Sequence, residues 1–223
     1  MAYSWDFSAL RGYQLAFLEG AGITLALGVA SSVIGSLLGV PVAILLRQHP
    51  LISTPVGLIV DAIRAIPNLV LILAAYYLPF DTLIGWSGPS PFLASLIGLT
   101  IAQIAYSADL VRSAIDAVPE AQLTAARGLG FREWQVARWV ILPFVVRDVL
   151  PSHMALWIGN VKLSSLASTI GVHDSVYVAR LAMSQTFRSL ESWIVVACIY
   201  IALVTPLTLL QRRIERSEWL RRR

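Results

Sequence analysis

Long uncharged segments alternate with short charged ones along most of this chain. Residues 20–46, 82–108 and 192–211 contain no Asp, Glu, Lys or Arg. Each is long enough to cross the hydrocarbon core of a bilayer as a helix, which needs about 20 apolar residues. Residues 53–79 and 148–170 are also apolar but carry internal charges. The pattern predicts an all-α polytopic membrane protein with five spanning helices, near residues 20–46, 53–79, 88–111, 148–170 and 191–211.

Composition agrees with a bilayer as the surrounding solvent. Hydrophobic residues make up 57% of the chain and charged residues 13%, whereas soluble domains carry about 25% charged residues. No tandem repeat or low-complexity linker divides residues 1–223, so we expect one transmembrane domain. Neither a small-residue cleavage site nor a soluble domain follows the first span, so we expect that span to be retained rather than removed as a signal peptide.

The distribution of basic residues predicts which ends of the spans face the cytoplasm. Five of them lie between the third and fourth spans, namely Arg112, Arg127, Arg132, Arg138 and Arg147, and six more lie from Arg212 to Arg223. With the N-terminus outside, the outer segments keep only Arg11, Arg180 and Arg188. Cytoplasmic loops are enriched in Lys and Arg, so we predict a cytoplasmic C-terminus. The Arg-rich tail, which includes Trp219, is expected either to rest on anionic lipid or to be a solvated stop-transfer segment.

Several classes of site are not expected in this sequence. The pI is near 9.6, but the basic residues are split between a loop and the tail, so we expect no nucleic-acid partner. Cys198 is the only cysteine and lies in an apolar run, which argues against a disulfide framework or a cysteine metal site. Lys162 is the only lysine and follows Val161, so the Gly-Lys-Ser/Thr of a phosphate-binding loop is missing. Energy for transport would therefore come from a partner or from an ion gradient.

The segment PEAQLTAARGLGFREWQVARWVILP, residues 119–143, is the largest predicted cytoplasmic element. Its opening Pro-Glu pair suits the first turn of a helix, and good helix formers follow. Gly128 and Gly130 allow the backbone to leave the helix and turn, and a second helix is expected from Arg132 to a break at Pro143. This helix-turn-helix could dock into a cleft on another protein, or it could be an amphipathic connector on the lipid surface.

This segment resembles the EAA loop of the permease subunits of ABC importers. That loop has Glu-Ala-Ala, a Gly four positions after the second Ala, and a hydrophobic-x-Leu-Pro ending. The positions in register here are Ala125, Ala126, Gly130, Val140, Leu142 and Pro143, and Thr124 stands where the family usually has the glutamate. The resemblance implies that the residues coupling this chain to an ATPase are Glu120, Gln122, Thr124, Ala125, Ala126, Arg127, Leu129, Gly130 and Arg132.

The resemblance extends over nearly the whole chain, toward the polar amino acid permease branch. WDFSALRGY and GITLALGV are similar to the N-terminal region of that branch, and QTFRSLE and RRIER also match. IRAIPNLVLIL resembles a Phe-Arg-Gly-Thr-Pro segment, with Ala65 and Ile66 replacing Gly-Thr. AYSADLVRSAIDAVPEAQ resembles the approach to the EAA loop, with Asp109 replacing Glu. KLSSLASTIGVHD resembles a Lys-Asp-Thr-Ser-Leu…Ile-Gly-Val segment, with Leu163 replacing Asp.

The resemblance implies the type I importer architecture. Two permease subunits, identical or paralogous, would form the pathway in the cell's inner membrane. Two cytoplasmic ATPase subunits would bind ATP and Mg²⁺ and grip the EAA loops, and a periplasmic or surface-tethered binding protein would deliver the solute. This chain would be a non-catalytic subunit without a cofactor. Its substrate could be a basic, acidic or amide amino acid, an opine, or an ectoine-like solute.

Two other classes of protein are alternatives to an importer subunit. A gradient-driven secondary carrier often shows internal repeats and helices broken at matching positions, whereas five spans cannot be halved evenly. A structural membrane-assembly protein would explain the bundle but not the EAA-like segment.

Charged and polar residues within the spans are candidates for the substrate path, because a charge in hydrocarbon usually faces the bundle interior. Arg64 can pair with Asp61 three residues earlier or face the central path. Lys162 has no acid at helical spacing within its span, so it needs a distant partner or a wet cavity. The candidate path residues are Arg64, Asn68, Gln103, Tyr106, Asn160 and Lys162, with interhelical hydrogen bonding as the alternative use of the Gln, Tyr and Asn side chains.

Two smaller groups of polar residues are expected to have structural roles. Asp109, Arg112 and Asp116 are spaced three and four apart, which predicts a ladder of ion pairs along one helix. His173 and Asp174 are expected outside, in an interfacial loop or a gate contact. No third metal ligand is near them in sequence, so no metal site is expected.

Overall fold

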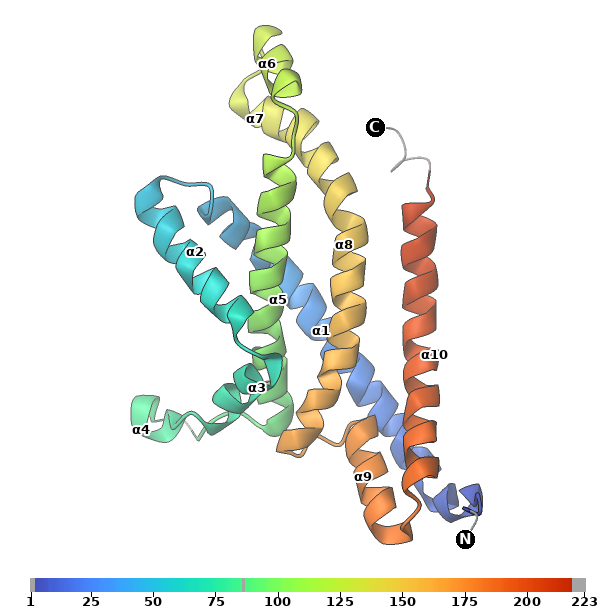
Figure 1. Cartoon of the computed structure of the whole chain (residues 1–223). Helices are drawn as coiled ribbons and strands as arrows, with labels where there is room; N and C mark the ends of the chain where they lie inside the picture. The colour runs from blue at the N-terminus through green and yellow to red at the C-terminus, as the bar shows by residue number, and fades with distance from the viewer. Residues whose placement is uncertain (1–2, 86, 218–223) are drawn as a thin grey trace.

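The computed structural model describes residues 3–85 and 87–217, apart from the side chain of Ile84, and within these ranges every regular element is helical (Figure 1). The elements are η1 (Phe7–Tyr13), α1 (Gln14–Leu45), α2 (Pro50–Ala65), α3 (Asn68–Tyr77), α4 (Phe80–Ile84), α5 (Pro91–Asp116), α6 (Glu120–Gly128), α7 (Glu133–Val136), η2 (Ala137–Ile141), α8 (Leu142–Leu163), η3 (Ser164–Ile170), α9 (Ser175–Thr186) and α10 (Ser189–Glu215). The predicted all-α class is confirmed. The predicted lipid contact of Trp219 and the last arginines lies outside the described residues.

Four helical segments are long and apolar enough to cross a membrane. They are Phe7–Leu45, Pro91–Asp116, Glu133–Ile170 and Ser189–Glu215. The bent pair of α2 and α3 passes the same test when its two helices are taken together. The structure therefore has four candidate crossings, or five if α2 and α3 together form one broken crossing.

The stretch predicted as one span at residues 53–79 is two helices, not one. The axes of α2 and α3 differ by 101°. Ile66 between them is extended, with φ −80° and ψ 129°, because a following proline disfavours the helical conformation. Pro67 then precedes the first residue of α3. The apolar run predicts a single span, but Pro67 determines the backbone conformation at Ile66 and so separates the two helices.

Helical backbone also continues past Pro143, where the second helix of the 119–143 segment was predicted to break. Pro143 lies in the first turn of α8, directly after one turn of π-helix at η2. A proline lacks the N–H that would bond to the carbonyl four residues earlier, and a π-turn shifts that pairing locally. The helical backbone from Glu133 therefore reaches into the membrane without an interruption at the proline.

Small residues let α1 pack closely against α5 and α8 at the centre of the bundle. A Cβ added at Gly28 would lie 2.6 Å from the Cα of Val161, and one at Gly35 would lie 2.5 Å from the Cβ of Gln103. The neighbouring Ser31 and Ser32 are fully buried. Small residues are the usual means of close helix contact in membranes, where burial of apolar surface supplies little driving force.

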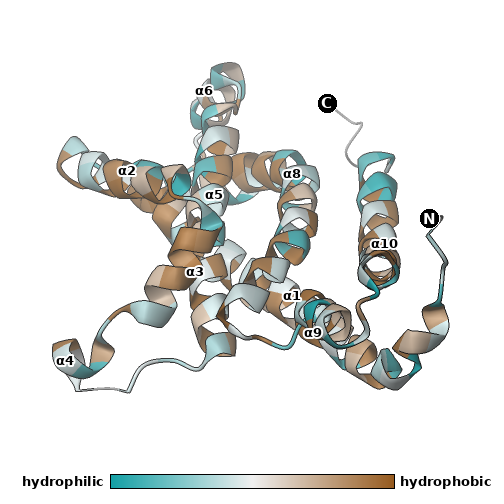
Figure 2. Cartoon of the chain, turned by 60° about the horizontal axis from the view of Figure 1, so that its bottom comes forward, coloured by the Kyte–Doolittle hydropathy of each residue, from teal (hydrophilic) through white to brown (hydrophobic). Residues whose placement is uncertain are grey.

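The last helix lies at the periphery of this bundle. Half of the most apolar window of α5 is buried, against 6% for α10. Figure 2 shows hydrophobic colouring along much of α1, α3 and α10. The N-terminus lies near α9 at one end of the molecule, and the C-terminal end of α10 points toward the end that carries α6 and α7 (Figure 1).

Candidate functional site

The helix-turn-helix at α6 and α7 projects beyond the ends of α5 and α8 (Figure 1). Gly130 forms the turn with φ +79°, a conformation that side chains with a Cβ resist. The amide of Gly130 donates to the carbonyl of Arg127 at 2.9 Å, and that of Phe131 donates to Ala126 at 3.2 Å. The predicted order of short helix, glycine turn and second helix is therefore present.

Arg127 and Glu133 join the two short helices across this turn. The Arg127 Nε lies 3.0 Å from Glu133 Oε1, and Nη2 lies 3.4 Å from Oε2. The Glu133 carboxylate raises the pKa of Arg127. A longer contact of 3.8 Å links Arg127 to Glu120 at the start of α6. Arg127, which the resemblance places among the residues that couple to an ATPase, is here already shared by two acids of its own segment.

Most of the predicted coupling residues lie at the surface. All except Ala126 are exposed, and Leu129 is 78% exposed at the tip beside the turn. The backbone N–H of Arg132 donates to the side chain of Gln135 at 2.8 Å, which fixes the start of α7. An exposed leucine on a rigid turn suits contact with an apolar surface outside this chain.

A groove separates α6 from the membrane-proximal part of α8. Gln122, Ala125 and Leu129 line it from the α6 side, and Trp139 and Arg147 line it from η2 and α8. Predicted coupling residues therefore form one wall of a concave surface. Glu215 of α10 lies at its edge, so the end of the last helix approaches the same groove.

Arg64 links the broken crossing to α5. Its Nη2 lies 3.0 Å from Asp109 Oδ2, whereas its distance to Asp61 Oδ1 is 3.5 Å. The guanidinium carbon also lies 5.8 Å from the ring centre of Tyr106, within range of a cation–π interaction. The pairing predicted with Asp61 is present, but the shorter contact is with the neighbouring helix.

The predicted ladder along α5 is only half formed. Arg112 pairs with Asp109 at 3.2 Å, whereas Asp116 pairs with Arg47 at the end of α1. The prediction of one continuous ladder was wrong, because the loop after α1 brings a closer cation to Asp116. The charges at this end therefore tie three helices together.

Gln103 and Asn160 are buried between helices. The Gln103 amide lies 3.4 Å from the hydroxyl of Ser36 on α1, and the Asn160 amide donates to Ser31 at 2.8 Å. Trp157 also donates to Ser36, at 3.0 Å. Interhelical hydrogen bonding, which was the alternative use of these amides, is therefore present within the subunit.

Lys162 is exposed and lines an open cavity between the end of α8, α9 and α10. Ser165, Tyr200 and Thr205 contribute hydroxyl groups to it, and its remaining lining is aliphatic. The hydroxyl of Tyr200 is buried, with the hydroxyl groups of Thr24, Ser164 and Ser165 near it. No carboxylate of the described residues lies within 4.0 Å of the lysine ammonium. No acidic partner of Lys162 lies among these residues, and the wet cavity expected as the alternative stays a prediction.

The remaining predicted residues lie at helix starts. Asn68 is half-buried at the first position of α3, after Pro67. Asp174 is fully buried and caps α9 by accepting from the Tyr177 amide at 2.9 Å. Burial raises the pKa of Asp174 to about 6. His173 stacks on Tyr177 with ring centres 4.3 Å apart. Within the described ranges no three His, Cys, Asp or Glu side chains are grouped so that they could hold a metal ion.

Comparison with known families identifies the class of protein that carries this arrangement. The family described as "Binding-protein-dependent transport system inner membrane component" matches residues 31–219. The chain belongs to this family. As a permease of this kind, it is an inner-membrane subunit, in agreement with its apolar helices.

Curated relatives match the permease over nearly its full length. The probable amino-acid ABC transporter permease protein PatM of Vibrio harveyi is 33% identical, with 93% of each chain covered. The glutamine transport system permease protein GlnP of Escherichia coli is 29% identical, over 95% of this chain and 97% of GlnP. The nopaline transport system permease protein NocM of Agrobacterium fabrum is 28% identical, over 91% and 86%. The family predicted from the EAA-like segment is therefore confirmed.

Solved structures agree with the fold of the permease. A chain from the crystal structure of an amino acid ABC transporter with histidines is 30% identical, with a TM-score of 0.87 over 96% of this chain and 99% of that one. A chain of an inward-facing methionine ABC transporter superposes with a TM-score of 0.76 over 92% and 97% at 21% identity, which supports the fold alone. The type I importer permease fold is therefore confirmed.

One polar cluster in the permease was missed by sequence reasoning. Glu191 is fully buried at the start of α10 and accepts hydrogen bonds from the Tyr3 hydroxyl and, at 2.9 Å, from the Asp6 amide. Arg188, three residues earlier, lies 3.8 Å from Glu191. Tyr3 and Asp6 lie more than 180 residues away along the chain, so no helical spacing could reveal these two partners.

Proposed function

We propose that this permease is the transmembrane subunit of an ATP-driven importer for polar amino acids or related solutes. It forms the path together with a second permease subunit, identical or paralogous. A periplasmic or surface-tethered solute-binding protein delivers the substrate. A cytoplasmic ATPase dimer binds ATP and Mg²⁺ and carries out hydrolysis, and this chain contributes no catalytic residue.

The exposed α6–Gly130–α7 segment is the observation that carries the proposal. Its turn is fixed by the φ of Gly130 and by the ion pair of Arg127 with Glu133, while the Leu129 tip stays exposed. A rigid projection with an exposed apolar tip suits insertion into a cleft of the ATPase. Five crossings with the N-terminus outside would place this segment and the C-terminus in the cytoplasm.

The solute is proposed from the relatives. Permeases named for glutamine and nopaline transport cover this chain almost completely, which supports an amino acid, an opine or a compound of similar polarity, including an ectoine-like solute. Arg64, Asn68, Tyr106 and Lys162 are proposed to face the path. Gln103 and Asn160 are assigned to interhelical bonding because their amides are engaged within the subunit.

Reconstitution tests this proposal directly. The permease should take up solute in liposomes only together with its ATPase and binding protein, and uptake should require ATP inside. The permease alone should neither hydrolyse ATP nor drive uptake from an ion gradient. Gradient-driven uptake by the purified chain would refute the proposal in favour of a secondary carrier. Cleavage by external protease of a tag placed after Arg223 in intact cells would refute the proposed orientation.

A further inference from the structure

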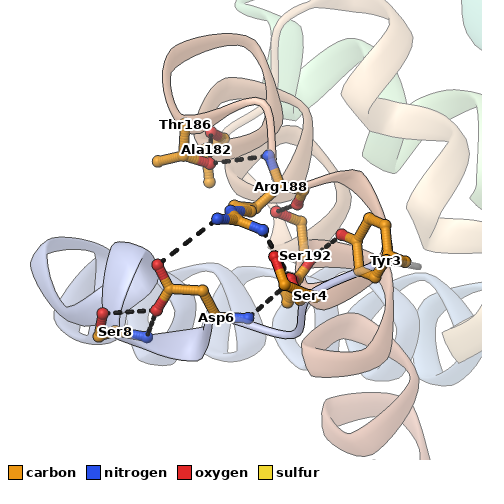
Figure 3. Close-up of polar contacts among 9 residues, drawn as sticks. Tyr3, Ser4, Asp6, Ser8, Ala182, Thr186, Arg188 and Ser192 are labelled. Atoms are coloured by element: carbon orange, nitrogen blue, oxygen red, sulfur yellow. Dashed lines mark hydrogen bonds and ion pairs between the residues drawn. The ribbon is translucent and has the colours of Figure 1, made fainter. Parts of the chain in front are cut away.

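The N-terminal segment before α1 has a polar face that binds the junction of α9 and α10. The Arg188 guanidinium donates to the carbonyl of Ser4 at 2.8 Å and lies 3.7 Å from Asp6 (Figure 3). The Asp6 amide and the Tyr3 hydroxyl both donate to Glu191, which is fully buried. These contacts hold residues 3–6 against the start of the last helix.

The other face of the same segment is aromatic and exposed. Tyr3, Trp5 and Phe7 alternate along the chain, and each ring is about half exposed, with Trp5 at 57%. The Tyr3 and Trp5 rings meet edge to face at 5.2 Å, and the Trp5 and Phe7 rings stack at 6.2 Å. The aromatic side chains therefore form one continuous surface that no described residue covers completely.

Phe187 adds a fourth aromatic side chain beside the Arg188 contacts. It is 86% exposed and ends α9 with φ +58°, the only described residue other than glycine with a positive φ. A bulky side chain in this conformation is an outlier that costs free energy. Exposure of an aromatic ring to water is unfavourable as well. Both features suggest that the ring has a favourable environment outside this chain.

The position of these rings identifies that environment. They lie where the membrane-spanning segments Phe7–Leu45 and Ser189–Glu215 begin, which is the level of the lipid headgroups. Aromatic side chains with one polar end, Trp and Tyr, are enriched at this level. The exposed Arg11 is a cation suited to lipid phosphate groups.

We propose that Tyr3, Trp5, Phe7 and Phe187 form an aromatic anchor that rests in the headgroup region of the bilayer. The polar contacts of Arg188 and Glu191 connect this anchor to the start of α10. Because α10 is the crossing with the least burial inside the subunit, the anchor sets its depth where helix packing does little. The partner is the lipid interface itself rather than the solute-binding protein.

Spin labels at two anchor positions test the proposal in the complete transporter. Cys198→Ser supplies a cysteine-free background, since Cys198 is the only cysteine. Labels are attached at Trp5→Cys and, separately, at Phe187→Cys, in vesicles of phosphatidylethanolamine and phosphatidylglycerol. Ala202→Cys, at an exposed position midway along α10, serves as the hydrocarbon reference, and Gln48→Cys, also at an exposed position, serves as the water reference. Accessibility to oxygen and to a water-soluble nickel chelate is measured by power saturation.

The expected ratio of oxygen to nickel accessibility at both anchor positions lies between those of the two references. A ratio equal to that at Gln48→Cys would overturn the proposal, because the rings would face water. Low accessibility to both reagents that is restored when the binding protein is omitted would also overturn it, since a protein would then cover the surface.

A matched pair of variants tests the link between the anchor and α10. Arg188→Gln should release the segment and raise nickel accessibility at the Trp5→Cys label several-fold. Arg180→Gln removes the same charge from an exposed position of α9. Arg180 forms no ion pair with residues 3–8, so this substitution should leave the label unchanged. Retention of the ATPase in the purified complex verifies the fold. Equal readings in both arginine variants would refute the link.

Discussion

Arg127 and Glu133 face each other across the turn at Gly130, with 3.0 Å between Nε and Oε1. Both side chains are largely exposed, so the pair contributes little to global stability. Its effect is local. The pair limits how far α6 and α7 can open about a glycine that provides no side-chain contact of its own.

Exchanging the two charges distinguishes an internal ion pair from recognition by a partner. Arg127→Glu alone should weaken retention of the ATPase and uptake, because it places three acids around one turn. The double variant Arg127→Glu with Glu133→Arg restores the pair in reverse and should recover uptake. The measurement is ATP-dependent uptake together with co-purification of the ATPase. Failure of the double variant, with normal insertion in the membrane, would show that the partner reads Arg127 directly.

Two glycines two residues apart provide a controlled test of the turn. A Cβ added at either Gly128 or Gly130 meets no atom within 4 Å, but only Gly130 has a positive φ. Gly130→Val should therefore strain the turn by about 1–2 kcal/mol, loosening the ATPase or uncoupling hydrolysis from uptake in the inserted protein. Gly128→Val should have a much smaller effect. If ATPase retention and coupling for Gly130→Val match those of the unmodified protein, the turn does not transmit the coupling.

Lys162 is expected to be needed for transport rather than for folding. Its ammonium lines a cavity without an acidic partner among the described residues, so Lys162→Met should lower uptake at least tenfold while insertion and ATPase binding persist. Lys162→Arg retains the charge and should keep part of the activity. Full uptake by Lys162→Met would remove this residue from the proposed path.

Asp174 should make stability depend on pH. Burial raises its pKa to about 6 from 3.8 in the unfolded chain, so the folded state favours the protonated acid. Its favourable contribution is complete below about pH 4 and is lost as the pH rises through 6, a change of roughly 3 kcal/mol at about 1.4 kcal/mol per pKa unit.

The substitution Asp174→Asn should remove this dependence and raise the unfolding temperature at pH 7.5 relative to the unmodified protein. Asparagine is as good an N-cap as aspartate, so the start of α9 is retained. Thermal unfolding in detergent from pH 4 to 8 measures the effect, and Asp81→Asn at an exposed site is the control. Parallel curves for unmodified and Asp174→Asn protein would contradict a buried, protonated acid.

The crossings and the 119–143 segment were predictable because their signals are local. Apolar length predicts a span, and the glycines at 128 and 130 predict a turn. The bend between α2 and α3 was partly visible as Pro67, but its 101° angle depends on what the two helices pack against. A proline predicts a break without giving its direction.

Ion pairs and buried polar groups were predicted only where their partners are close in sequence. Arg64 with Asp61 and Arg112 with Asp109 follow helical spacing. The contact of Arg64 with Asp109 and the burial of Glu191 by residues near the N-terminus depend on which helices become neighbours. A single sequence contains no signal for which helices become neighbours, and therefore none for these contacts.

The length of α1 has a consequence for the membrane around the protein. At 1.5 Å per residue, the 32 residues of α1 span about 48 Å. The uncharged stretch at residues 20–46 alone would span about 40 Å as a helix. The hydrocarbon core of a bilayer is only about 30 Å thick. Such an excess is accommodated by tilt, and Figure 1 shows α1 crossing obliquely behind α5 and α8. The angle at which the first helix crosses the rest of the bundle is therefore matched to the thickness of the bilayer, and a thinner or thicker membrane would act directly on the closest helix contacts in the subunit.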